Sequence, residues 1–333
     1  MHTADRVTLA RLPSGVAVET TIHRYGTGDG PICYVQAAQH GREINGTECC
    51  RRLHERLTAP AADLAATDSD DPLAAALDGT LIVVPVADPL TFDRVSYTTP
   101  EILDSANPNM NRCWPGDSEG TLHQRVAATL WEYAGDADAI VDLHTGSPAM
   151  ETHTVYLRGD DASRRLAEAF GTDLLLAEAA GDDADTEWDE RNFGGKLRVA
   201  ATREGIPSIT PELGSNKQLD EAAIHTGIDG LLAVFRHLGL LAGDPEPWAG
   251  VRARNHLGRI RAADSGLFVP NADAELGSKT EPGETFGTVY DPATYEPLQA
   301  VTADRAGIVY SVAREATVTA GQTLVGIAER LDE

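Results

Sequence analysis

The sequence predicts an α/β protein with a mostly parallel sheet covered by helices on both faces, followed by a small all-β domain. Continuous apolar runs alternate with helical segments as far as residue 241. Strands made of such runs are typical of parallel sheets that are buried on both sides. After residue 250 the pattern changes to short strands separated by glycine turns, which indicates a separate β domain.

The individual elements follow from the same patterns. Residues 6–24 alternate apolar and polar side chains around a Pro-Ser-Gly turn, which predicts a β-hairpin. Buried strands are predicted at residues 31–38, 80–87, 139–144, 153–157, 174–177 and 208–213. Helices are predicted at residues 47–57, 123–133, 162–170, 196–204 and 221–241. The intervening segments at 58–78, 88–122 and 181–191 are predicted loops, the first with an alternative as a short helix.

An Ala-Gly-Asp-Pro-Glu-Pro stretch at residues 242–247 marks a break in the chain. We therefore predict a larger N-terminal domain over 1–243 and a C-terminal β domain over 250–333. Within the latter, two similar stretches, at about residues 266–290 and 306–328, predict the half-repeat of a barrel-sandwich fold. Carrier domains with that pattern need a lysine at a hairpin tip, and the only candidate, Lys279, precedes Thr-Glu-Pro-Gly instead of an apolar residue. We expect no attached prosthetic group.

The charge balance is strongly acidic, with 52 Asp and Glu against 27 Lys and Arg and a net charge of −25. This excess argues against nucleic acid as a partner. Because strong salt screens such self-repulsion, we interpret the composition as halophilic, adapted to a salt-loaded cytoplasm. No basic-plus-apolar leader and no long apolar run occur, so we expect a cytoplasmic protein without a membrane partner. The four cysteines form no C-x-x-C pair and are expected to be free thiols.

Two polar motifs at strand ends indicate a metal site. His40 and Glu43, in the sequence His-Gly-Arg-Glu, follow the predicted strand 31–38. His144 ends the strand 139–144, and Asp142 lies two residues earlier on the same face, where it could orient an imidazole. Nitrogen and oxygen donors suit Zn²⁺, and a catalytic zinc site uses three protein ligands. Each motif alone is also consistent with polar residues at the protein surface.

Further candidates for catalysis and binding follow. Glu212, in Thr-Pro-Glu-Leu-Gly, ends the predicted strand 208–213 and could act as general base. Asn111 and Arg112 could hold a substrate carboxylate, since arginine binds carboxylates through two parallel hydrogen bonds. Arg94, earlier in the same loop, could stabilise the oxyanion. The alternative for each is a structural residue of a strand end or loop.

Together, H-G-x-E, N-R-x-(aromatic)-P-G, D-L-H-T-G and T-x-E-L-G resemble the succinylglutamate desuccinylase/aspartoacylase family, which is related to the zinc carboxypeptidases. The resemblance covers nearly the whole chain. It implies a three-layer α/β/α domain with a mixed sheet, one zinc ion per chain, and hydrolysis of a small N-acyl amino acid. It also implies His40, Glu43 and His144 as zinc ligands, Glu212 as general base, and Asn111 with Arg112 as the carboxylate clamp. The chain departs from the family at Asp88-Pro89, where Asn-Pro is usual, and at Trp114, where Phe is usual.

Several alternatives stay open. The second reading is a carboxypeptidase that acts on peptides, and the third is a non-catalytic metal-binding protein on the same fold. The acyl group, the amino acid and the oligomeric state, including a homo-oligomer, are not determined by the sequence. Substrates consistent with it are N-acetyl or N-succinyl derivatives of aspartate, glutamate or diaminobutyrate. The sequence also leaves open the roles of Arg198, Arg203, Tyr290 and Tyr295, and of the acidic loop 181–191 as a lid.

Overall fold

A mixed β-sheet forms the centre of the computed structural model, which describes residues 1–26, 28–59, 73–146, 149–180, 184, 187–254, 259–272 and 274–331. In spatial order its strands are β1(His2–Arg11), β2(Ala17–Gly26), β4(Thr80–Val84), β3(Ile32–Ala37), β5(Ala139–Gly146), β8(Ser208–Ser215), β6(His153–Leu157), β7(Leu174–Glu178) and β9(Val251–Arg254). Strands β4, β3, β5 and β8 run parallel to one another. The N-terminal hairpin and the contact between β6 and β8 are antiparallel, so the sheet is mixed.

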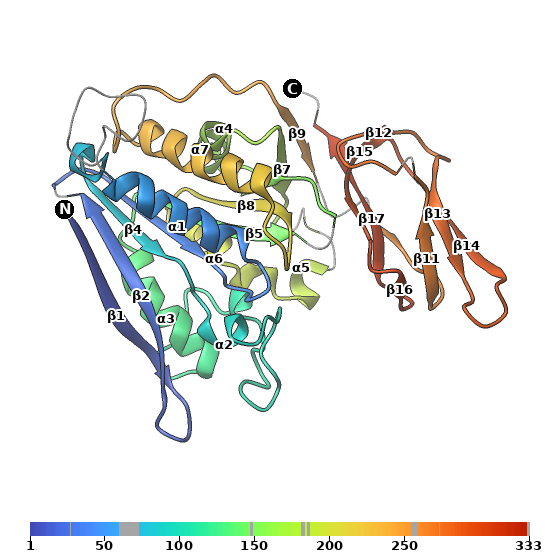
Figure 1. The fold of residues 1–333 in the computed structure, drawn as a ribbon, viewed down its shortest axis with the longest axis horizontal. Coiled ribbons are helices and arrows are strands. Elements are labelled where there is room, and N and C mark those ends of the chain that lie inside the picture. The colour runs from blue at the N-terminus through green and yellow to red at the C-terminus, as the bar shows by residue number, and fades with distance from the viewer. Residues whose placement is uncertain are drawn as a thin grey trace.

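Helices cover both faces of this sheet (Figure 1). One face carries α1(Asn45–Thr58), α4(Asp161–Phe170) and α7(Glu221–His237), whose apolar side chains share one core cluster with β3 and β5. The other face carries α3(Leu122–Ala134) and α6(Leu197–Arg203), which belong to a second cluster. The predicted three-layer α/β/α architecture is therefore confirmed. Short helical segments are η2(Leu73–Ala76), α2(Pro89–Phe92), η3(Met110–Arg112), α5(Glu187–Glu190) and η5(Phe193–Gly195).

The helix boundaries follow from local chemistry. Asp160 caps α4 by accepting a hydrogen bond from the backbone of Ser163, and the helix ends at Gly171 with a φ of 87°. Helix α7 ends at His237, four residues before its predicted end at 241, and Gly239 follows with a φ of 79°. A left-handed glycine turns the chain out of the helix at little cost, which accounts for the earlier end. Residues 60–72 of the predicted loop 58–78 lie outside the part of the chain that the structure describes.

The C-terminal region is all β, as predicted. Its strands are β10(Arg259–Arg261), β11(Gly266–Pro270), β12(Lys279–Thr280), β13(Thr285–Tyr290), β14(Pro297–Thr302), β15(Gly307–Val312), β16(Thr317–Val318) and β17(Thr323–Arg330). The two stretches with similar sequence both fold as a strand, a two-residue strand and a further strand. Strand β9 pairs with both β7 and β17, so the main sheet continues into this region (Figure 1). The domain boundary at residues 243–250 stays a prediction.

Two further predictions concern the chain as a whole. All four cysteines are buried and none forms a disulfide, as expected. Among the helices that the structure describes, none has the length and apolar character needed to cross a bilayer.

Candidate metal centre and active site

The three predicted metal ligands meet at the ends of adjacent parallel strands. Strands β3 and β5 are paired, with Ala37 opposite Leu143, so the residues that follow Ala37 lie beside the end of β5. Nδ1 of His40 lies 2.9 Å from one oxygen of Glu43, and Nδ1 of His144 lies 2.8 Å from the other. All three side chains are buried, at 3% to 5% exposure. They form a compact group of ligand atoms within 4.8 Å of one another.

The backbone before the first motif explains how His40 reaches this point. Ala38 has a φ of 52°, an uncommon conformation for a residue with a side chain, and it turns the chain sharply after β3. Gly41 lies against the backbone of Thr91, and a Cβ at this position would come within 2.0 Å of it. The glycine of the His-Gly-Arg-Glu motif is thus required by close packing against α2.

The second nitrogen of each imidazole is also held. Nε2 of His40 lies 3.1 Å from the side-chain oxygen of Asn109, and Nε2 of His144 lies 2.9 Å from the carboxylate of Asp142. Each Nε2 can donate its proton to the oxygen beside it, so Nδ1 is the nitrogen of each ring that, once deprotonated, could bind a metal ion together with Glu43. Metal-binding histidines are commonly oriented in this way. The donor set therefore fits a divalent cation such as Zn²⁺.

The carboxylate of Asp142 is itself fixed. It accepts hydrogen bonds from Gln36 at 3.0 Å and from Gln39 at 2.6 Å. The side-chain oxygen of Gln39 accepts a bond of 2.7 Å from the indole of Trp114. These contacts link Trp114, the aromatic residue of the N-R-x-(aromatic)-P-G motif, to His144. The hydrogen bond to Gln39 needs the indole N–H of tryptophan, which the phenylalanine usual in the family lacks.

Electrostatics of the cluster reflect the same arrangement. Burial acts to raise the pKa of Glu43, but the charges of His40 and His144 hold this pKa below its usual range. Burial acts to lower the pKa of His144, but Asp142 and Glu43 raise it well above the usual value. Positive charge at this point is therefore stabilised by the surrounding carboxylates, as a metal site requires.

Glu212 lies on β8, which pairs with one edge of β5 while β3 pairs with the other. Strand β8 places it directly opposite His144 on β5 and opposite His153 on β6. The side chain is partly buried and lines the same cavity as the three metal-site residues. Burial raises the pKa of Glu212 to about 7, although the charge of His144 acts to lower it. A carboxyl group with this pKa can both take up and release a proton near neutral pH.

Asn111 and Arg112 also reach this cavity. The Asn111 side chain accepts a hydrogen bond of 3.0 Å from the backbone of Leu197, which ties η3 to α6. The Arg112 guanidinium packs 4.7 Å above the Phe193 ring. Burial lowers the pKa of Arg112, although not enough to remove the charge of an arginine. Both side chains thus line the cavity, and their role as a carboxylate clamp stays a prediction.

Arg94 is placed differently. Its side chain is exposed, and it is not among the described residues that line the cavity. Two other residues occupy the neighbourhood of the metal cluster. The Tyr97 ring lies 4.0 Å from the ring of His40, and the Arg42 guanidinium lies 4.7 Å above Tyr97. Nε of Arg42 is buried and has no hydrogen-bond partner within the described part of the chain.

The cavity itself has a volume of about 340 Å³ and is predominantly basic. Three glutamates line it, and six of its residues are arginine or lysine. These basic residues are Arg42, Arg112, Arg191, Lys196, Arg198 and Arg259. These six basic residues form a local concentration of positive charge in a chain whose net charge is −25.

These six residues form a basic wall of the cavity, and one acid, Glu178, binds two of them. Nζ of Lys196 donates to Glu178 at 2.5 Å, and the guanidinium of Arg198 binds the other oxygen of the same carboxylate. Arg198 also donates to Thr210 at 2.7 Å. Burial lowers the pKa of Lys196 to about 7, although Glu178 acts to raise it. Neither Lys196 nor Glu178 was predicted from the sequence, in which Lys196 stands out only as one of three lysines.

The residues left open by the sequence are now placed. Arg198 lines the cavity, whereas Arg203 donates to the backbone of Gly194 near the surface. Tyr295 is 81% exposed, and Tyr290 on β13 is not among the described lining residues. The phenol that reaches the cavity from the C-terminal region is Tyr310 on β15. Of the acidic loop 181–191, residues 181–183, 185 and 186 lie outside the described residues.

Comparisons with known proteins show which family the chain resembles. Residues 29–238 match the succinylglutamate desuccinylase/aspartoacylase catalytic domain. The chain is 26% identical over 325 residues to the N-alpha-acetyl-L-2,4-diaminobutyric acid deacetylase of Halomonas elongata, covering 91% of this chain and 83% of that enzyme.

Solved structures show the same fold. A succinylglutamate desuccinylase/aspartoacylase from Rhodobacter sphaeroides has a TM-score of 0.78 at 25% identity, covering 100% of this chain and 96% of the other. A metallo-carboxypeptidase from Burkholderia cenocepacia has a TM-score of 0.52 at 19% identity, covering 71% of this chain and 65% of the other, which reflects the fold alone. With the family model matching more than half of its length, the chain belongs to the succinylglutamate desuccinylase/aspartoacylase family.

Proposed function

We propose that this protein is a zinc-dependent hydrolase that removes the acyl group from a small N-acyl amino acid. The observation that carries the proposal is the convergence of the His40, Glu43 and His144 cluster with Glu212 in one cavity. The family and the deacetylase relative support the reaction class. The cluster offers one set of ligands for one zinc ion per chain.

When bound, a zinc ion acidifies water and polarises an acyl carbonyl. Glu212 acts as general base, because it lies opposite His144 in the sheet and its carboxylate lines the cavity, where it can accept a proton from the attacking water. The protonated carboxyl group then returns that proton to the departing amine. A non-catalytic metal protein has no use for a carboxyl group in this position, so the structure favours an enzyme.

Stabilisation of the oxyanion falls to residues near His40. Arg94 was predicted for this role, and its exposed position gives it no contact with the cavity. We assign the role to Tyr97 and Arg42, which are stacked on one another at the metal cluster. Arg42 lines the cavity, where its guanidinium could donate a hydrogen bond to a substrate oxygen.

The substrate carboxylate is held by Arg112 with Asn111 close by. The remaining basic wall, built by Lys196 and Arg198 around Glu178, favours a second negative charge on the substrate. We therefore rank N-acyl derivatives of aspartate or glutamate, and N-succinyl amino acids, above N-acetyl-diaminobutyrate, whose side chain is cationic. A cavity of about 340 Å³ suits such molecules better than peptides.

The test is a deacylation assay of the zinc-loaded protein against a panel of substrates. The panel contains N-acetylaspartate, N-succinylglutamate, N-acetyl-diaminobutyrate and a blocked dipeptide. We expect the highest kcat/KM for a substrate with two carboxylates. Faster hydrolysis of the dipeptide would show a carboxypeptidase instead, and no turnover of any substrate with zinc bound would contradict an enzyme of this class.

A further inference from the structure

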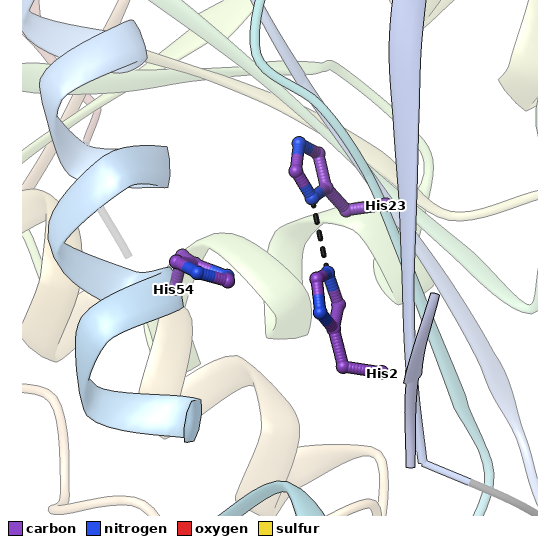
Figure 2. A group of neighbouring side chains, drawn as sticks. All are labelled: His2, His23 and His54. Carbon is purple, nitrogen blue, oxygen red and sulfur yellow. Dashed lines mark hydrogen bonds between the residues drawn. The ribbon is translucent and has the colours of Figure 1, made fainter. Parts of the chain in front are cut away.

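A second cluster of histidines lies outside the cavity, on the N-terminal hairpin. It consists of His2 on β1, His23 on β2 and His54 on α1 (Figure 2). None of the three lines the cavity described above. The cluster is the other group among the described residues whose side chains could jointly hold a metal ion.

The fold explains why these residues meet. His2 lies opposite Tyr25 in the antiparallel hairpin, and His23 is two residues before Tyr25, so all three project from the same face of the sheet. That face packs against α1, which contributes His54. The ring centroids of His2 and His54 are 4.9 Å apart, and those of His23 and His54 are 5.8 Å apart. Three elements thus contribute one imidazole each.

The nitrogen atoms are already close to a coordination geometry. Nε2 of His2 lies 3.1 Å from Nδ1 of His23, and one ligand atom from each histidine lies within 4.8 Å of the others. Zinc–nitrogen bonds of about 2.0–2.1 Å place tetrahedral ligands roughly 3.4 Å apart. Small rotations of the side chains are therefore sufficient to surround an ion.

The third imidazole is oriented as metal ligands often are. The hydroxyl of Tyr25 lies 2.8 Å from Nδ1 of His54, which leaves Nε2 to face a ligand. A hydrogen bond to the second nitrogen fixes the ring and its tautomer. Tyr25 is 2% exposed, so packing around its ring fixes the position of the hydroxyl.

Two of the three imidazoles have a pKa below the usual value. Burial lowers the pKa of His2, and the nearby charge of His54 adds to the effect. Burial also lowers the pKa of His23, with further contributions from the other two histidines. The rings are partly exposed, so an ion can enter from solvent and keep water in its remaining position. The overall negative charge of the protein favours a cation at its surface.

We propose that His2, His23 and His54 form a second metal site, selective for late first-row transition ions such as Zn²⁺. Three neutral imidazoles suit these ions and do not suit Mg²⁺ or Ca²⁺, which prefer oxygen ligands. The ion would connect β1 and β2 to α1 and so stabilise the N-terminal hairpin. This inference is independent of the proposed deacylase activity.

The experiment measures zinc content at equilibrium in the full chain, after removal of metal and dialysis against buffered zinc. We expect His54→Gln and His23→Gln each to hold one zinc ion fewer than the unaltered chain, with unchanged deacylase activity. His225→Gln on α7, an exposed histidine outside the cluster, is the matched control and should lose no ion. Equal zinc content in the unaltered chain and both cluster variants would overturn the proposal.

A second readout separates this site from the active site. In the His144→Ala background, added zinc should raise the melting temperature, because an ion that binds only the folded chain stabilises it. The rise should be absent when His54→Gln is added. A rise of the same size in both would show that zinc acts elsewhere and would contradict the proposal, whether or not the chain is a deacylase.

Discussion

Replacing Glu212 by glutamine should stabilise the metal-free protein at alkaline pH. Burial raises the pKa of Glu212 from 4.5 in the unfolded chain to about 7 in the folded one. Each tenfold difference in proton affinity corresponds to about 1.4 kcal/mol, so ionising this group at pH 8 costs the folded state about 3 kcal/mol. The partial exposure of the side chain reduces this cost, and we expect a gain of about 1–3 kcal/mol for Glu212→Gln.

The sign of the pH dependence is specific. A carboxyl group with a raised pKa contributes full stability below the unfolded value of 4.5, and this contribution is lost as the pH rises toward 7. The difference between Glu212→Gln and the unaltered chain should therefore be below about 1 kcal/mol at pH 5 and reach its maximum above pH 7.

Urea unfolding of the EDTA-treated proteins at pH 5 and pH 8 measures both differences. Added zinc should reduce the gain of the variant, because a cation beside Glu212 favours its charged form. Glu43→Gln serves as a contrast, since the pKa of Glu43 is held below its usual range and its loss should destabilise the chain at pH 8. An identical gain for Glu212→Gln at both pH values, or a loss of stability at pH 8, would refute the reasoning.

Three further predictions concern activity. His144→Ala should lose the active-site zinc, measured as metal content. Glu212→Ala should keep this zinc and lose a factor of about 10²–10⁴ in kcat. Normal turnover in either variant contradicts the assignment. Arg112→Ala should raise KM at least about tenfold, and Arg112→Lys should restore little of it because the two-pronged contact is lost; an unchanged KM argues against the clamp. Because burial lowers the pKa of Lys196 to about 7, KM for a substrate with two carboxylates should rise between pH 6.5 and 8.5, and Lys196→Met should remove this rise; a pH-dependent KM that persists in the variant shows that another group is responsible.

The metal cluster could be predicted from sequence because its geometry follows from the sheet. His144 and Glu212 belong to paired strands, and His40 follows a third strand beside them, so their proximity depends only on strand order and direction. The same holds for Asp142, whose position two residues before His144 puts both side chains on one face. Short motifs on neighbouring strands carry enough information to locate a site.

Other residues around the cavity could not be predicted, because their contacts do not follow from the pairing of strands. Tyr97 and Arg94 lie in an irregular segment, where no periodic pattern relates position in the sequence to side-chain direction. Arg94 consequently seemed suited to the oxyanion role and lies at the surface, while Tyr97 packs against His40. Lys196 reaches the cavity from the start of α6 and depends on Glu178, which is far away in sequence. Such contacts are set by packing and not by local propensity.

The contrast between an acidic chain and a basic cavity predicts how salt affects this enzyme. At low ionic strength the net charge of −25 repels an anionic substrate at long range and destabilises the folded chain. At about 1 M salt the Debye length falls to about 3 Å, which removes this long-range repulsion, while the partly buried cations of the cavity are screened less. We therefore expect KCl in the molar range to raise both the melting temperature and kcat/KM for a substrate with two carboxylates. A melting temperature that is constant from low to molar KCl would reject the salt-adapted interpretation of the composition. A kcat/KM that falls steadily with salt would show that attraction of the substrate by the cavity outweighs its repulsion by the surface of the protein.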